Sequence, residues 1–139
     1  MIHLARMLLF LLVTVVTQAQ EQSNKIEVEI HNIAGSEGQM LIGLYNSEAN
    51  WLKKIYKPGT AKISDGKSAF VFTNIPDGVY AVSVFHDENN DGKLDTNFFG
   101  IPSEDTGSSN DAPARFGPPK WKDAKFELKG KNIKQIINL

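Results

Sequence analysis

Residues 26–31 read IEVEIH, in which three branched apolar side chains alternate with two glutamates and a histidine. A period of two residues is typical of a β-strand with one buried face and one solvated face. Further short apolar segments follow it. They are separated by turn-forming sequences such as GSEG at 35–38, DG at 65–66 and PDG at 76–78. The pattern therefore predicts an all-β domain.

We expect about seven short strands and one short helix, arranged as an antiparallel β-sandwich of immunoglobulin or transthyretin-like type. A closed barrel is the alternative. Segment 47–56 is predicted to be the helix, because Trp51, Leu52 and Ile55 are spaced by three and four residues. The strands are predicted over residues 26–31, 39–46 (central in its sheet), 60–64 and 68–73 (a hairpin), 79–86, and 122–129 and 132–139 (a last hairpin).

The 139 residues suit a single domain, carry a net charge of −1 and include no cysteine. This charge balance argues against a nucleic-acid-binding protein, and the lack of cysteine excludes disulfides and thiolate metal sites. Arg6, the apolar run 7–16 and the small residues around Ala19 form the pattern of a secretory signal. We expect cleavage after Ala19, which leaves residues 20–139 as an exported domain, periplasmic or secreted, without a membrane span. A buried N-terminal helix is the alternative.

Residues 87–120 show no strand or helix period, and a loop of this length in a compact domain is usually functional. Its first nine residues, DENNDGKLD, carry side-chain oxygens at relative positions 1, 3, 5 and 9 and a glycine at position 6, as in an EF-hand calcium loop. Phe98 stands where that loop needs its glutamate, so a carboxylate from further along the chain must complete the set. The predicted Ca²⁺ ligands are Asp87, Asn89, Asp91, the carbonyl of Lys93, Asp95 and Glu104, with Asp105 as an alternative to the last. The other interpretation is an Asx-rich turn, in which the same side chains bond nearby amides without a metal.

Aromatic side chains are the second signal in this loop. Phe98, Phe99, Phe116 and Trp121 are predicted to form a surface that binds a glycan or a protein outside the cell or in its envelope. The alternative is that these rings hold the loop against the sandwich.

A longer ordered pattern runs through the same region. It comprises IPDG at 75–78, VYAV at 79–82, HDEN at 86–89, Gly92, LDTN at 94–97, FGIP at 99–102, Glu104, Gly107, SN at 109–110 and FGPP at 116–119. With this pattern the chain resembles, over residues 25–139, the bacterial exported family called domain of unknown function 2141. The resemblance implies a small exported β-sandwich and supplies no catalytic residue. Asp105-Thr106 departs from the pattern, where a glycine and an aromatic residue are expected, and this affects the local path of the loop.

No established catalytic motif is present: GxSxG, HExxH and phosphate-loop sequences are all missing. His86 beside Asp87 is the best candidate for a general base, and a strand-end imidazole that caps the loop is the alternative. We therefore predict a non-catalytic binding or accessory module with an unidentified ligand. A small envelope hydrolase that uses His86 with loop carboxylates, and a purely structural envelope protein, remain as alternatives.

Overall fold

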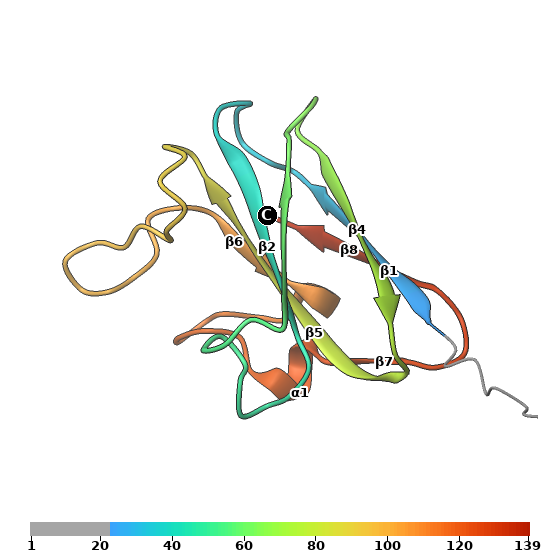
Figure 1. Ribbon diagram of the computed structural model, residues 1–139. Coiled ribbons are helices and arrows are strands. Elements are labelled where there is room, and N and C mark those ends of the chain that lie inside the picture. Colours follow the sequence, from blue (N-terminus) through green and yellow to red (C-terminus); the bar gives the residue numbers. More distant parts are fainter. Residues whose placement is uncertain (1–22) are drawn as a thin grey trace, which may run out of the picture.

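The computed structural model describes residues 23–139, so the predicted signal segment lies outside the described residues. Within them, two β-sheets pack face to face as a sandwich (Figure 1). The strands are β1 (Asn24–His31), β2 (Gln39–Tyr45), β3 (Lys57–Ala61), β4 (Ser68–Ile75), β5 (Gly78–Asp87), β6 (Thr106–Ser108), β7 (Phe126–Leu128) and β8 (Ile133–Asn138). A 3-10 turn, η1 (Ser109–Asp111), and one short helix, α1 (Trp121–Ala124), complete the elements. None of the helices in residues 23–139 is long and apolar enough to cross a membrane.

The first sheet has the order β4-β1-β8, and the second has the order β3-β2-β5-β6. All pairs are antiparallel except β1 with β8, which run parallel. Strand β7 pairs with the start of β5, whereas β6 pairs nearer the end of the same strand. This arrangement confirms the predicted antiparallel-rich sandwich and the central place of β2.

The core lies between the two sheets and follows from the alternation along each strand. Ile26, Val28 and Ile30 of β1 are at most 1% exposed, and the glutamates between them face outward. The facing sheet contributes alternate residues of β2 and β5, which meet the β1 side chains. Burial of these apolar faces stabilises the sandwich by roughly 25 cal/mol for each Å² removed from water.

The predicted helix over residues 47–56 is wrong. Isolated turns occupy this segment. They are closed by separate backbone hydrogen bonds, such as the one from Lys54 N to Asn50 O at 2.9 Å. Leu52 has a φ of +55°, which interrupts any right-handed helix. Within residues 23–139 the α-helix is instead α1, which overlaps the start of the segment 122–129 that was predicted to be a strand. The strand β7 in that segment has only three residues.

Both predicted hairpins are also wrong, although their turns are present. Ser64 and Lys67 exchange two backbone bonds of 2.9 and 3.0 Å around Asp65-Gly66. However, β3 and β4 on either side of this turn belong to different sheets, and so do β7 and β8 on either side of Gly130. A turn sequence predicts a local reversal of the chain, but it does not predict which sheet each flanking strand joins.

Candidate binding arm and cleft

Residues 88–105, which we call the arm, leave the sandwich between β5 and β6 and project from it as a ribbon (Figure 1). His86 N donates to Asp105 O at 2.9 Å and closes the ribbon at its base. Further out, Ser103 N donates to Asp95 O at 2.9 Å, and Asn97 N donates to Ile101 O at 2.8 Å. The backbone of the arm is thus paired along its length, which confirms an ordered loop at one end of the sandwich.

Asp87 anchors the arm to the second sheet. Its carboxylate is fully buried and accepts hydrogen bonds from Gln39 Nε2 at 3.0 Å, Gly92 N at 3.0 Å and Asp91 N at 3.2 Å. Burial by itself raises the pKa of Asp87, but these three donors outweigh it, and the net pKa lies below the ordinary aspartate value. Asp87 is therefore a carboxylate at neutral pH, fixed at the start of the turn.

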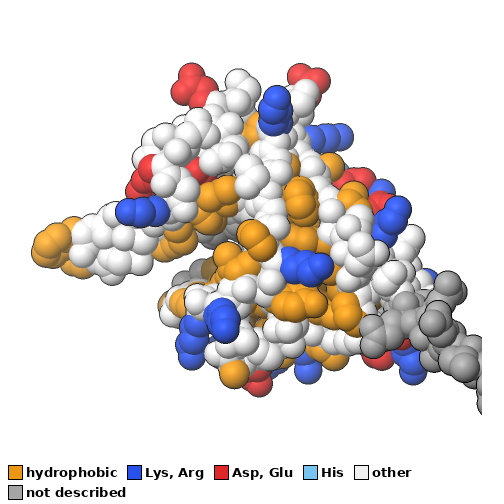
Figure 2. Space-filling model, viewed as in Figure 1, with side chains coloured by type: hydrophobic (Ala, Val, Ile, Leu, Met, Phe, Trp, Pro, Cys, Tyr) orange, Lys and Arg blue, Asp and Glu red, His pale blue; other side chains and the backbone are white. Residues whose placement is uncertain are grey.

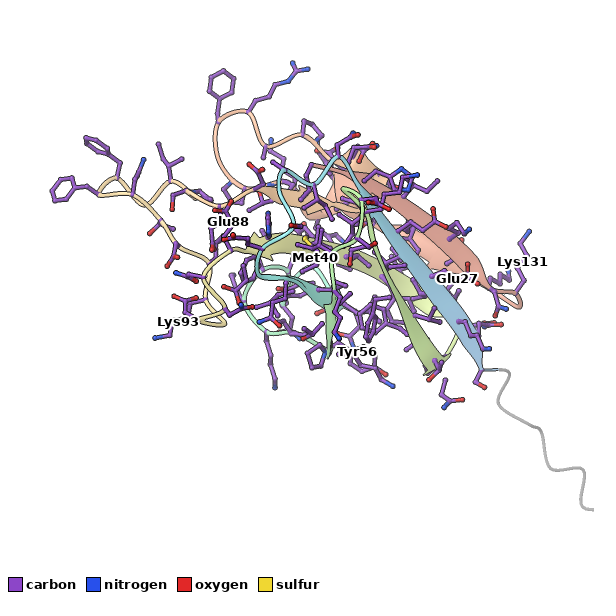
Figure 3. All side chains as sticks on the ribbon, turned by 90° about the horizontal axis from the view of Figure 1, so that it is seen from above. Glu27, Met40, Tyr56, Glu88, Lys93 and Lys131 are labelled. Carbon is purple, nitrogen blue, oxygen red and sulfur yellow. The ribbon has the colours of Figure 1, made fainter. Side chains whose placement is uncertain are left out.

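The turn that follows brings three of the predicted ligand side chains together. Asn89 Nδ2 lies 2.7 Å from Asp95 Oδ2 and 3.5 Å from Asp91 Oδ2, so its amide stands between the two carboxylates. Asp91 Oδ1 accepts from Lys93 N at 2.8 Å. Figure 3 shows Lys93 at the outer end of this turn, with Glu88 nearer the sandwich. The side chains of Asn89, Asp91 and Asp95 thus meet in one short segment, with the amide nitrogen of Asn89 facing the two carboxylates.

Glu104 lies across the base of the arm, 8% exposed. Its Oε1 accepts from Glu88 N at 3.1 Å and its Oε2 accepts from Asp95 N at 3.0 Å. One carboxylate therefore holds both ends of the turn, which is a role that the spacing alone did not indicate. In the part of the chain that the structure describes, no three carboxylate or imidazole side chains are already arranged to hold a metal.

A cleft of about 630 Å³ lies between the arm, β6 and the segment 114–119. Figure 2 shows this hollow beneath the projecting arm. Its apolar lining comes from both sides: Leu94, Ile101 and Pro102 of the arm, and Leu52, Ala114, Pro118 and Pro119 of the body. Pockets of this volume hold drug-sized ligands in other proteins, about 300–1,000 Å³ being usual.

The phenylalanines of the predicted binding surface are fully displayed to solvent. Phe98 and Phe99 at the tip of the arm are 97% and 81% exposed, with ring centroids 5.5 Å apart, and Phe116 is 104% exposed. Trp121 departs from the prediction because it is only 9% exposed. It packs edge-on against Trp51 at 5.9 Å, and Trp51 Nε1 donates to Pro119 O at 2.7 Å. The two tryptophans therefore support one wall of the cleft and do not form its surface.

The family described as "Uncharacterized protein conserved in bacteria (DUF2141)" matches residues 28–136. The chain belongs to this family. The match confirms the resemblance drawn from the loop pattern and covers both sheets, the arm and the cleft. The family description names no activity.

This DUF2141 chain was also compared with curated proteins and with solved structures. No curated protein matches it. Among solved structures it is similar to a pilus-presented adhesin, Spy0125 (Cpa), at 12% sequence identity and a TM-score of 0.27. The similarity covers 85% of this chain but only 27% of the adhesin, so the chain spans about a quarter of that protein.

His86, the candidate base, is enclosed in the sandwich of the DUF2141 domain. It is 1% exposed, and its Nε2 lies 2.6 Å from Glu37 O. The ring therefore donates a hydrogen bond to this carbonyl. Successive side chains on a strand point to opposite faces, so His86 faces the core while Asp87 faces the arm. Nδ1 has no hydrogen-bond partner among residues 23–139, and a Glu88 oxygen lies 3.9 Å away. An imidazole in this position does not contact a substrate, so the geometry does not favour the hydrolase.

Two residues that organise the site were not assigned this role from the sequence. Gln39 holds Asp87 only because β2 and β5 pair in the register that sets these two residues opposite each other. Ser109 is fully buried, accepts from Val82 N at 2.9 Å and donates to Ala124 O at 2.5 Å. It thereby ties the segment after β6 to both β5 and α1. Both roles depend on strand pairing across long stretches of chain.

Proposed function

We propose that this DUF2141 domain is an exported, non-catalytic binding module whose arm is ordered by a calcium ion in the Asp87–Asp95 turn. The observation that carries the proposal is the convergence of the Asn89, Asp91 and Asp95 side chains next to the ionised Asp87. Calcium takes six to eight oxygen ligands at about 2.3–2.6 Å, and alternate residues of a tight turn deliver them.

The charge of the arm supports a cation. Residues 87–105 contain six carboxylates and one lysine. Carboxylates held close together repel each other unless hydrogen bonds or a cation compensate. The amide of Asn89 already lies between two of them, and rotation of this amide by half a turn would present its oxygen in place of its nitrogen. The same side chain then serves as a ligand, in exchange for the 3.3 Å hydrogen bond that Asn89 Oδ1 now accepts from Asp91 N.

The ligand-binding face of the module is the cleft together with the exposed rings of the arm tip. Apolar side chains that are displayed together on a monomer mark interaction sites, and the partner is a glycan or a protein met outside the cytoplasm. Export rests on the signal pattern of residues 1–19.

Thermal unfolding of residues 20–139 in calcium and in chelator tests the calcium site. Binding to the folded state alone stabilises it by about 2.7 kcal/mol at a hundredfold excess over Kd, and we expect the melting temperature to rise by about 5–15 °C. Asp91→Ala should abolish this rise because it removes a central carboxylate of the turn.

Glu127→Ala is the matched control, since it removes an exposed carboxylate on β7, away from the arm. It should leave the calcium response intact. Equal melting temperatures of the parent protein in calcium and in chelator would contradict the calcium site and leave the hydrogen bonds of the Asx turn as the cause of order.

A further inference from the structure

The tip of the arm is an apolar projection over which no other part of residues 23–139 packs. Phe98, Phe99 and Ile101 are 97%, 81% and 58% exposed. Residues 96–103 contain no charged side chain. The backbone of the tip is nevertheless fixed, because Asn97 Oδ1 accepts from Phe99 N at 2.9 Å and from Ile101 N at 3.1 Å. The rings are thus presented on a preformed support, which lowers the entropy cost of docking them.

The same molecule carries a cavity of matching chemistry. The cleft of about 630 Å³ is lined mainly by apolar side chains from two walls, and its volume exceeds that of two phenyl groups. The tip cannot fold back into its own cleft, because Leu94, Ile101 and Pro102 on the arm form one of the walls. An occupant with the shape of the tip must therefore come from a second molecule.

The charges on the two sides of the cleft are complementary. The arm is acidic, with five carboxylates against Lys93. The segments behind the opposite wall are basic: residues 50–57 and 112–122 contain lysines and one arginine and no carboxylate. Figure 2 shows Lys and Arg side chains gathered on the body below the hollow. These cations flank the body wall of the cleft and are not among its lining residues, which on the arm side include Glu104 and Asp105. They attract the acidic arm of another copy as it approaches, which favours encounter and orients the two copies.

We propose that two copies of this chain exchange arms, so that the Phe98-Phe99 tip of each copy fills the cleft of the other. This deepens the proposed function, since it names the occupant of the same cleft and rests on that cleft being the binding face. Because tip and cleft lie on one surface of each copy, a two-fold axis satisfies both contacts at once and closes the assembly as a dimer. Aromatic side chains bury about 150–250 Å² each. The aromatic tips of two copies, with the walls that they cover, approach the ~1,200 Å² of a specific interface.

Analytical ultracentrifugation of residues 20–139 over about 1–100 µM tests the exchange. We expect a concentration-dependent dimer, and we expect Phe98→Ser/Phe99→Ser to raise its dissociation constant at least about 30-fold, as the loss of a central hot spot does. Val79→Ser is the matched control: it removes a side chain that is 45% exposed at the opposite end of β5 and should leave the dimer unchanged. Melting temperatures of the variants verify that each is folded.

A variant of the cleft distinguishes arm exchange from simple contact between two tips. Ala114 lines the cleft and is exposed, so Ala114→Glu places a charge in the cleft and leaves the tip intact. Arm exchange predicts that Ala114→Glu alone is monomeric, and that mixing it with the tip variant restores a weaker dimer through one intact tip and one intact cleft. An Ala114→Glu protein that dimerises like the parent would overturn the proposal.

A parent chain that stays monomeric at about 100 µM would also overturn it. Sedimentation of that monomer with phosphatidylcholine vesicles, lost in the tip variant, would instead assign the tip to a membrane surface. The centrifugation is carried out in calcium and in chelator. The calcium site of the Asp87–Asp95 turn is tested independently, by the thermal unfolding described above. A dimer without a calcium response contradicts the metal site alone, whereas a calcium response without a dimer contradicts arm exchange alone.

Discussion

Gly38→Ala is expected to lower the free energy of unfolding by about 2–5 kcal/mol, the sum of two independent costs. Gly38 has a φ of +75°, and a residue with a Cβ costs about 1–2 kcal/mol in this left-handed region. The added Cβ would also meet the carbonyl oxygen of Asp87 and lie 2.7 Å from Glu88 Cα. Both neighbours are backbone atoms, so no rotamer change relieves the contact, and overpacking of this kind costs about 1–3 kcal/mol.

Gly35→Ala is the matched control, three residues earlier in the same turn. Its φ is +79°, but a Cβ there has no neighbour within 4 Å. Only the conformational cost applies, and we expect a loss of about 1–2 kcal/mol. Urea unfolding of both variants measures the difference, which reports how closely the β1–β2 turn approaches Asp87. Equal losses in the two variants would show that this close approach is not present in solution.

The close approach of Gly38 to the arm illustrates what local sequence patterns can and cannot predict. The alternation in residues 26–31 correctly predicted β1 and its buried face, and the two-sided apolar segment 39–46 correctly predicted a central β2. The partners of β3, β4, β7 and β8 were not predictable in this way. Each of the two turns lies where the chain passes from one sheet to the other, and a turn sequence is the same in a hairpin and in such a crossing.

The candidate site shows the same division. The spacing of DENNDGKLD indicated a tight turn of polar side chains, and the structure contains this turn because its geometry is local. Calcium ligation by these side chains stays a prediction. The contacts of Gln39 and Gly38 with Asp87 depend on the register between β2 and β5, which no local pattern contains. The aromatic residues were similarly ambiguous: only tertiary packing separates the exposed Phe98 from the buried Trp121.

Asp87→Asn should cause the second large loss, about 1–3 kcal/mol at neutral pH. The carboxylate is buried and accepts from Gln39, Asp91 N and Gly92 N. An asparagine offers one oxygen, so its NH₂ group must face at least one of these donors, and a buried donor left without an acceptor costs about 1–3 kcal/mol. Urea unfolding of the variant and the parent protein at pH 7 measures this loss. Glu88→Gln is the matched control, because that side chain is 59% exposed and its substitution should change the free energy by less than about 0.5 kcal/mol.

The loss caused by Asp87→Asn should also depend on pH in a defined direction. The pKa of Asp87 in the folded protein lies below its ordinary value, because the three donors favour the carboxylate more than burial disfavours it. A depressed folded pKa contributes stability that is fully present above the unfolded pKa of about 3.9 and is lost as the pH falls through the folded pKa. The difference in unfolding free energy between the parent protein and Asp87→Asn should therefore be constant from pH 7 to about pH 5 and shrink as the pH is lowered further. If the difference stayed constant down to pH 2, the stabilisation would come from the shape of the side chain and not from its charge. Asp87 would then be a packing residue at the base of the arm and not a fixed anion next to the proposed calcium turn.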